Sequence, residues 1–590
     1  MLLNNKMRPA MAGAAHGTNV HNEAPRHRDG MCFSAESNTT DDFNSFGNVG
    51  SNKRGGQAPR NGSKRPVFDL SFFDRFKNLD KKTLMIIGIA ALALVVVIAL
   101  IVILAVAGAN KNIVFEDNAY ITYADNDGKY HVIANGKEVD HEFEGEVELV
   151  VSANNDFAYI VDNGYEGKIV YLLEGKKLDY ITPTSAPAME VLAFASLVPG
   201  IVVEEDDGFR LYTDGHDERI IKKSANAENF MISADASTVV YTAVPTSGAD
   251  TSRRMYVYQN GSAETLKGGC VPVAVSSYGN YVYATATTND GVNGLFVINT
   301  KDMEPASVEK SAGFAKVLAM NLKGDEIIFQ VINNGANSST YCYKHKKNGD
   351  GVTTRLGDSI ITPANADPDI AIYETFKDTY MNAVNDLGED RGVYYVGKDY
   401  TAKRIAPTHG QFSPDMKYFY FIGTTNSGVG LKQIDLTDDN YPTKSIYSDV
   451  VDFVVTEKGN VYHLDDQNTL RYYKTSEDDS YRRGLGDDVT TISFFRYANE
   501  IYYTVSDLDE NKVYTSKEGS EKDPAKLDST VITATPLFSH PNAKRSYAYY
   551  YDLTNGGWMI FYTSNGNSFN MVTSDCQSIT GVEIPDNMYQ

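Results

Sequence analysis

A turn-and-strand pattern that recurs at nearly constant spacing constrains the fold more than any other feature of the chain. Between residues 112 and 590 a turn, a β-rich strand, a second turn and a second strand follow one another repeatedly. Successive units lie about 43 residues apart, which is the length of one four-stranded propeller blade. The strands after the first turn are centred near Tyr120, Tyr159, Val202, Val240, Val282, Ile327, Ile372, Phe419, Val461, Ile501 and Ala548.

The residue types within each unit suit four short strands. The unit Gly410–Ser448 divides into QFS, YFYFIGTT, LKQIDL and PTKSIYS, with the turns PDMK and NSGVG after the first two. Gly, Asn and Asp supply the backbone conformations of turns, whereas Tyr, Val, Ile and Thr favour strands. The sequence therefore predicts an all-β region built of about eleven four-stranded repeats.

One unit resembles a known repeat family. The segment Phe412–Phe421, FSPDMKYFYF, is similar to the core of WD40-like (TolB-type) β-propeller repeats, and Ser276–Tyr283 and Ser233–Tyr241 are looser copies. Met416 stands where the family usually has Gly. The resemblance implies a β-propeller over most of residues 112–590. The residues that match the motif most closely are Ser413, Pro414, Asp415 and Lys417.

The number of propellers stays open at this stage. Single propellers usually have four to eight blades, so eleven units would fit two propellers in series, with six and five units. The stretch Ile361–Asp369, ITPANADPD, is the most linker-like break between units. The alternatives are that this stretch is a long turn inside one blade and that all units form one large propeller.

An apolar segment precedes the repeats. Leu84–Gly108 contains 25 residues without a charge, and a bilayer core needs about 20. The sequence predicts one transmembrane helix there, a disordered basic tail over residues 1–66, a juxtamembrane segment over 67–83, and the propeller region over 112–590. The juxtamembrane segment is either a helix lying on the membrane surface or an extension of the spanning helix.

The distribution of charge predicts the orientation in the membrane. Residues 1–82 hold 13 basic and 8 acidic residues, so they carry +5 of a total formal charge of −23. Positive charge beside a spanning helix stays in the cytoplasm. We expect a single-pass protein of the cell membrane with a cytoplasmic N-terminus and an extracellular propeller. The whole chain resembles single-span bacterial surface proteins that carry a propeller outside.

The sequence contains few signs of catalysis. It has no C-x-x-C, H-E-x-x-H, Walker A or G-x-S-x-G motif, so it predicts no enzyme, no cofactor and no metal site. Calcium is the alternative at Asp125–Gly128, because DNDG is similar to the start of a calcium loop. The rest of such a loop does not follow, and a hairpin turn explains the same residues.

Three cysteines lie in the propeller region, Cys270, Cys342 and Cys576. Their number is odd and their spacing is wide, so we expect unpaired, buried thiols rather than a disulfide framework.

These observations favour a binding or scaffold module. We expect the propeller to bind an extracellular protein, peptide or glycan at the cell envelope, and its acidic charge argues against nucleic acid. The alternative is a propeller-type polysaccharide lyase or another glycan-active enzyme. His409 and His540 would serve such an enzyme, because each lies near the start of a first strand, where blades line the central channel.

Overall fold

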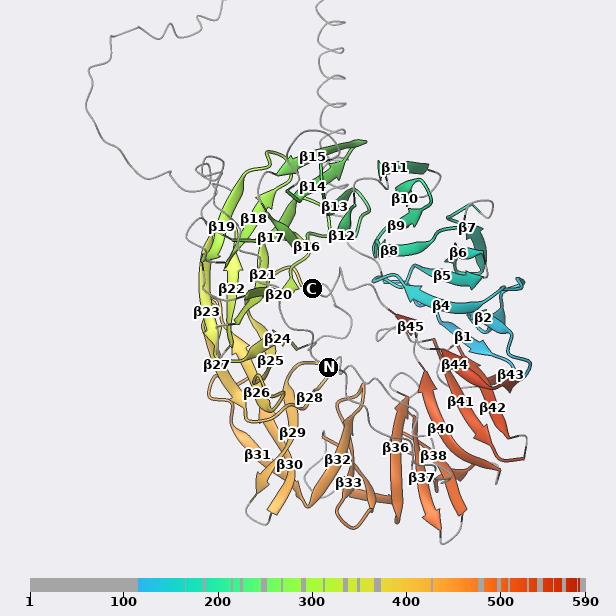
Figure 1. The fold of residues 1–590 in the computed structure, drawn as a ribbon. Helices are drawn as coiled ribbons and strands as arrows, with labels where there is room; N and C mark the ends of the chain where they lie inside the picture. The colour runs from blue at the N-terminus through green and yellow to red at the C-terminus, as the bar shows by residue number, and fades with distance from the viewer. Residues whose placement is uncertain are drawn as a thin grey trace, which may run out of the picture. The chain divides into compact units, whose positions relative to one another are not determined.

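The computed structural model contains eleven β-sheets that follow one another around a ring (Figure 1). It describes residues 115–583, apart from 165, 184–186, 214–215, 223–225, 246–251, 267–268, 288–292, 311–313, 333–337, 347–350, 365–372, 426–427, 476–481, 496–499, 508–509, 521, 528–529, 538–544, 555, 565–568 and 581. The predicted all-β fold and the number of repeats are confirmed: the protein is one propeller of eleven blades, which we number in chain order.

The strand bounds follow the order of the blades. Blades 1 to 3 contain β1 (Tyr120–Ala124), β2 (Tyr130–Ala134), β3 (Lys137–Glu138); β4 (Glu146–Val151), β5 (Phe157–Gly164), β6 (Gly167–Glu174), β7 (Lys177–Tyr180); β8 (Glu190–Phe194), β9 (Gly200–Glu205), β10 (Gly208–Thr213) and β11 (His216–Lys222). Blades 4 to 6 contain β12 (Glu228–Ile232), β13 (Thr238–Ala243), β14 (Arg254–Gln259), β15 (Ser262–Leu266); β16 (Val271–Val275), β17 (Tyr281–Thr287), β18 (Asn293–Asn299), β19 (Pro305–Lys310); β20 (Phe314–Met320), β21 (Glu326–Ile332), β22 (Ser338–Lys344) and β23 (Val352–Gly357).

Blades 7 to 9 contain β24 (Ile360–Pro363), β25 (Thr379–Val384), β26 (Asp390–Val396), β27 (Ala402–Ala406); β28 (Gln411–Phe412), β29 (Tyr418–Thr425), β30 (Gly428–Asp435), β31 (Thr443–Ser448); β32 (Val450–Val455), β33 (Val461–Asp465), β34 (Leu470–Tyr473) and β35 (Arg482–Gly486). Blades 10 and 11 contain β36 (Val489–Phe495), β37 (Glu500–Asp507), β38 (Glu510–Lys517), β39 (Ala525–Lys526); β40 (Val531–Leu537), β41 (Ser546–Asp552), β42 (Gly557–Thr563) and β43 (Asn570–Cys576). The chain ends its described part with β44 (Ser578–Thr580) and β45 (Val582–Glu583).

The stretch considered as a break between two propellers begins within a blade. Ile361 belongs to β24, which pairs with β25 in the same sheet. Residues 365–372, among them the predicted strand centre Ile372, lie outside the described part of the chain.

A shared turn between the first two strands explains why the repeats hold their register. In five blades a Ser or Asn side chain accepts a hydrogen bond from the backbone N–H five residues later, and the residue between them has a positive φ. The acceptors are Ser152, Ser233, Ser276, Asn321 and Ser413, at 2.9–3.0 Å. The residues with positive φ are Asn155, Ala236, Gly279, Gly324 and Met416. Side chains that bond to their own turn fix its geometry locally.

Hydrophobic side chains pack between neighbouring blades, and buried tyrosines connect one blade to the next. The Tyr159 hydroxyl donates to the carbonyl of Ala195 at 2.8 Å, and the Tyr283 hydroxyl donates to that of Gly324 at 2.8 Å. Burial raises the pKa of both tyrosines well above the usual value, so both hydroxyls remain protonated donors. These two interfaces therefore each contain a hydrogen bond that a Phe at the same position could not make.

The last two described strands close the ring by pairing with strands of the first two blades. We call these four strands, β1, β4, β44 and β45, the closure seam. β44 pairs antiparallel with β1 and becomes the inner strand of blade 1. β45 pairs parallel with β4, which gives blade 2 a fifth strand on its inner side (Figure 1). A hydrophobic cluster joins blade 11 to blade 1, with Ile121, Tyr123, Ile133, Tyr547, Ile560 and Cys576 buried together.

The three cysteines of the propeller are buried and unpaired, as expected. Burial raises the pKa of Cys270 to about 11 and that of Cys576 to about 12, which keeps both as unreactive thiols.

Other predictions concern residues that the structure does not describe. The apolar segment Leu84–Gly108, the tail 1–66 and the segment 67–83 all lie outside the described residues. Among the residues that are described, no helix is long and apolar enough to cross a membrane.

Candidate functional site

The residues that match the repeat motif form a turn between β28 and β29. The Ser413 hydroxyl donates to Asp415 Oδ1 at 2.7 Å and accepts from the Tyr418 N–H at 2.9 Å. Lys417 Nζ lies 2.9 Å from Asp415 Oδ2. Burial alone would raise the pKa of Asp415, but the hydrogen bonds from Lys417 and Ser413 outweigh it and lower that pKa. These residues, with Pro414 between them, hold the blade's turn.

Of the two histidines named for the lyase alternative, the structure describes His409, which contacts one carboxylate. His409 precedes β28; its backbone N–H donates to Asp390 Oδ2 at 2.6 Å, and its Nδ1 lies 3.4 Å from Asp390 Oδ1. His540 lies outside the described residues. No group of three or more His, Cys, Asp or Glu side chains that could hold a metal is found where the structure describes the chain.

The residues considered for calcium build a hairpin turn. Asp125 Oδ1 accepts from the backbone N–H of Asp127 at 2.9 Å and from that of Lys129 at 2.8 Å. Asp125 Oδ2 lies 3.0 Å from His131 Nε2. Both carboxylate oxygens therefore have partners within the protein.

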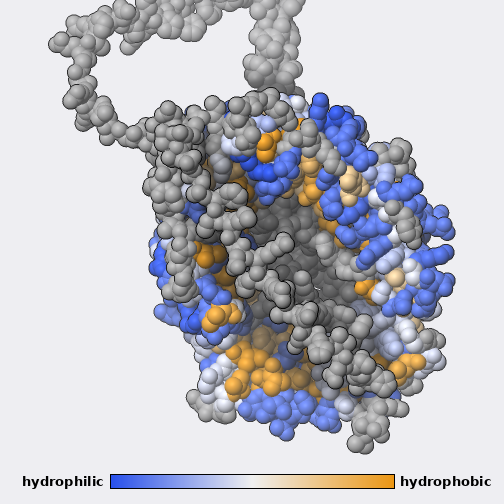
Figure 2. Space-filling view, viewed as in Figure 1, coloured by the Kyte–Doolittle hydropathy of each residue, from blue (hydrophilic) through white to orange (hydrophobic). Residues whose placement is uncertain are grey.

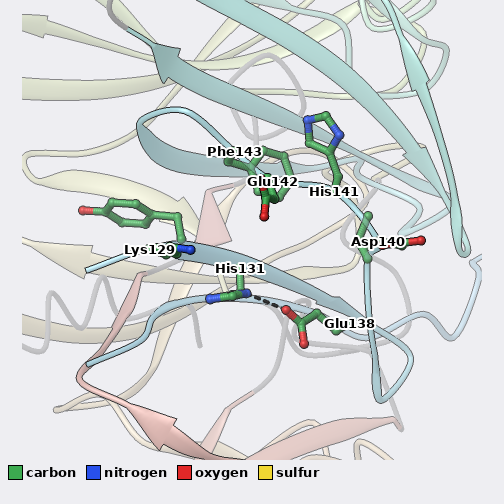
Figure 3. A pocket seen from close by; sticks show the side chains of 9 residues that line it. Lys129, His131, Glu138, Asp140, His141, Glu142 and Phe143 are labelled. Carbon is green, nitrogen blue, oxygen red and sulfur yellow. Dashed lines mark hydrogen bonds and ion pairs between the residues drawn. The ribbon is translucent and has the colours of Figure 1, made fainter. Parts of the chain in front are cut away.

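The same hairpin borders a cavity of about 500 Å³ at blade 1 (Figure 3). β2 and β3 supply one side, and the segment that leads on toward β4 supplies the other. In Figure 3 Glu142 and Phe143 lie opposite β2, and the Glu142 carboxylate points toward that strand. The cavity is lined by Lys129, Tyr130, His131, Glu138, Val139, Asp140, His141, Glu142 and Phe143.

His131 is held between two carboxylates at this cavity. Its Nδ1 lies 2.5 Å from Glu138 Oε1, and its Nε2 contacts Asp125 (Figure 3). Its ring stacks on Tyr123 with the ring centres 4.9 Å apart. Burial alone would lower the pKa of His131, but the hydrogen bonds to Asp125 and Glu138 outweigh it and raise that pKa. The hydrogen bond from His131 in turn lowers the pKa of Asp125.

Aromatic rings continue from the cavity onto blade 2. The rings of His141 and Phe143 meet edge to face with centres 4.8 Å apart, and the Phe143 and Tyr171 rings are 5.8 Å apart. His141 Nε2 lies 2.9 Å from the Tyr171 hydroxyl. Tyr180 packs against Tyr171 at 4.9 Å and is 57% exposed. Exposed rings beside free carboxylates can bind basic side chains or sugars.

Sequence reasoning named Asp125 but missed this site. His131 and Glu138 are brought together by the tight hairpin at Asn135–Gly136, in which β3 pairs with β2. A two-residue Asn-Gly loop predicts that hairpin and places those side chains diagonally across it. The position of His131 and Glu138 on either side of Asn135–Gly136 was the sequence feature that could have predicted their contact.

Comparison with known proteins identifies the fold and little beyond it. No protein-family model matches the chain, and no curated protein matches it. Solved propeller structures do. TolB from Acinetobacter baumannii is similar over 63% of this chain and 76% of its own, with 12% identity and a TM-score of 0.20.

Enzymes are also among the similar structures. Oligogalacturonate lyase from Vibrio parahaemolyticus matches over 55% of this chain and 99% of its own, with 9% identity and a TM-score of 0.27. Dipeptidyl peptidase 4 from Porphyromonas gingivalis matches over 60% and 64%, with 8% identity and a TM-score of 0.33. At these identities the likeness concerns the fold alone.

The prediction that the chain is not an enzyme is contradicted by these comparisons. Several of the similar structures are enzymes or enzyme domains, namely propeller peptidases and oligogalacturonate lyases. Missing sequence motifs do not exclude catalysis, because side chains from different blades can converge at a propeller's surface without any local motif. The reactions and substrates of those enzymes remain theirs.

Proposed function

We propose that the chain is a membrane-held propeller that binds a protein, peptide or glycan of the cell envelope. The cavity at blade 1 is the observation that carries this proposal. It combines exposed carboxylates with aromatic rings, and an exposed aromatic surface beside polar groups is typical of binding sites. Figure 2 shows that hydrophilic residues gather along much of the outer edge of this face, which suits a surface in water.

The location in the membrane rests on the sequence. The apolar run Leu84–Gly108 and the +5 charge of residues 1–82 support a cytoplasmic N-terminus and an extracellular propeller. Protease added to intact cells should remove an epitope placed at Gln590 and spare one placed at Met1. The reverse pattern would contradict the orientation.

A pocket variant tests binding by the full chain. Glu142→Gln combined with Phe143→Ala removes one charge and one ring from the cavity, while both positions remain compatible with the hairpin beside them. The full chain in lipid nanodiscs should retain a defined set of envelope proteins or glycans, and this variant should retain several-fold less.

The control changes the same residue type far from the cavity. Glu264 is exposed on β15, the outer strand of blade 4, so Glu264→Gln removes the same charge there. Equal retention by all three proteins would exclude the cavity as the binding site.

A further inference from the structure

The outer edge of blade 1 is open beside the cavity. β3 has two residues and pairs with β2 only at Ile133 and Ala134, whereas the outer strands of blades 2 to 9 have four to seven residues. After β3 the chain turns away, and the His141 N–H donates to the Val139 carbonyl at 2.9 Å. The fourth strand therefore stops before it reaches Tyr130.

The backbone of Tyr130 faces that open edge. Asp125 N–H bonds to the Lys129 carbonyl and Asn135 N–H to the Ala119 carbonyl, so the odd-numbered residues of β2 bond toward β1. Backbone groups alternate in an antiparallel pair, so Tyr130 and Val132 direct theirs outward. The Val132 carbonyl accepts from the Val139 N–H at 2.8 Å, which confirms the alternation. An exposed strand edge of this kind can pair with an added extended segment.

The cavity beside this edge offers free negative charge. Glu138 pairs with His131, but Asp140 and Glu142 line the cavity, are exposed, and take part in no ion pair within the described residues. Lys129 is the one lysine or arginine in the lining. A basic side chain would find two carboxylates there, together with the Phe143 ring for its apolar stem.

We propose that this edge binds an extended basic peptide segment, which pairs with β2 at Tyr130 and places a Lys or Arg side chain in the cavity. The proposal rests on the proposed function and specifies its ligand. The outward N–H and C=O groups favour a peptide over a sugar, because they match the donors and acceptors of another strand. The carboxylates select the basic side chain.

Defined peptides test this on the full chain in nanodiscs. The probe is a fluorescein-labelled peptide of eight residues that alternates Val and Thr and carries one central Lys. Three matched probes replace Lys with Gln, replace it with Glu, or methylate the backbone nitrogens on either side of it. Fluorescence anisotropy should show that Lys→Gln weakens binding about fivefold to tenfold, which corresponds to one partly exposed ion pair of about 1 kcal/mol. Binding of the Lys peptide should weaken further as salt rises.

Variants of the protein locate the site. Asp140→Asn combined with Glu142→Gln should remove the preference for Lys over Gln and leave residual binding of the Gln peptide. Glu264→Gln should keep the preference, and circular dichroism should be the same for all proteins. Equal binding of the Lys and Gln peptides, or a preference that survives in the double variant, would overturn the proposal.

A competition experiment with a glycan distinguishes the basic-peptide proposal from the broader proposed function. If an oligomer of glucosamine competes with the Lys peptide and the methylated peptide binds as well as the unmodified one, the site binds a cationic glycan and the peptide proposal fails. If no peptide binds while the pocket variant loses envelope ligands, the proposed function stands and the ligand class is wrong. If the peptides bind as predicted and no envelope ligand is retained, the ligand class stands and the envelope role fails.

Discussion

Blade 5 and blade 1 are both four-stranded sheets, but their strands come from the chain in two different ways. Blade 5 comes from one continuous stretch of chain, in which β16 to β19 follow one another. Blade 1 has β1 to β3 near residue 120 and takes its inner strand, β44, from residues 578–580. Inner blades can therefore fold from local contacts, whereas blade 1 is complete only when the two ends of the propeller meet. Bringing the two ends of the propeller together loses more chain entropy than pairing strands that are neighbours in sequence.

The two blades differ in how the inner strand is connected and not in the kind of contact. β44 pairs with β1 at three positions, whereas β16 and β17 pair at four and are joined by a turn. Tyr547 connects blade 11 to blade 1 through its hydroxyl, as Tyr283 connects blade 5 to blade 6. The closure seam thus repeats the contacts of the other interfaces, but no turn joins β44 to β1, which makes the seam the place where the ring should open first.

Removing the closing strands should have the largest effect. A chain that ends at Cys576 lacks β44 and β45 and should lose about 3 kcal/mol or more of unfolding free energy, from several backbone hydrogen bonds at about 1 kcal/mol each and the uncovered core of blade 1. Urea unfolding followed by the fluorescence of Trp558, the one tryptophan of the chain, reports on blade 11 beside the seam. A chain that ends at Glu583 keeps both strands and is the reference. Equal stability of the two chains would show that the seam does not hold the ring.

Replacing the two interface tyrosines, Tyr547 and Tyr283, should have the second largest effect on the free energy of unfolding. The Tyr547 hydroxyl donates to the Ala119 carbonyl at 3.1 Å and accepts from the Gly136 N–H at 3.1 Å, and the Tyr283 hydroxyl donates to Gly324. Tyr547→Phe and Tyr283→Phe should each cost about 1–2 kcal/mol, because each leaves a buried backbone group without its partner. Similar losses in chemical denaturation would show that the seam is as well bonded as an inner interface. A negligible loss at Tyr547 alone would indicate a loose seam.

The shared turn should respond in opposite directions at the two places. Met416 lies in blade 8 with φ 56°, where a Met side chain is strained and glycine is not, so Met416→Gly should stabilise by about 1 kcal/mol. Asn155 has φ 58° in the turn after β4, beside the seam, but its Nδ2 donates to the carbonyls of Glu116 and Asn118 at 2.7 Å each. Asn155→Gly should therefore destabilise. Thermal unfolding of both variants measures the contrast, and a gain in both would mean that the Asn155 amide contributes nothing to closure.

Two histidines should give the smallest effect, again with opposite signs. The raised pKa of His131 means that its protonated form stabilises the fold, and this stability is lost as pH rises through the folded pKa. Burial lowers the pKa of His345 in blade 6, so protonation there favours unfolding as pH falls below about 6.5. His131→Gln should therefore lower Tm more at pH 5.5 than at pH 8.5, and His345→Gln should do the reverse. Parallel pH profiles for the two variants would contradict the assignment of partners.

The sequence predicted the blades because the information for each blade is local. The predicted strand centres Tyr159 and Ile501, for example, fall within β5 and β37, the second strands of their blades. Turn residues such as Ser413 bond to their own turn, and alternating Tyr, Val and Ile fill the interfaces on both sides. The turn recurs in five blades and the strand residues recur throughout, so their regular spacing was enough to place the strands.

Closure and the candidate site could not be predicted in the same way. The pairing of β44 with β1 joins residues more than 450 positions apart, and no feature of Ser578–Thr580 distinguishes it from other short strands. The cavity exists because β3 stops after two residues and the chain crosses to blade 2 along Asp140–Phe143. Those residues match no motif, and the site they form depends on how short β3 is.

Amide hydrogen exchange of the intact protein tests the closed ring most directly. If β44 is the inner strand of blade 1, its amides should exchange together with those of β1 and far more slowly than those of an unfolded chain, but faster than those of β16, because the seam opens first. Mass spectrometry of peptides that cover residues 577–583, 120–124 and 271–275 provides the comparison within one sample. Exchange of residues 577–583 at the rate of an unfolded chain, while β1 and β16 stay protected, would contradict closure by the end of the chain.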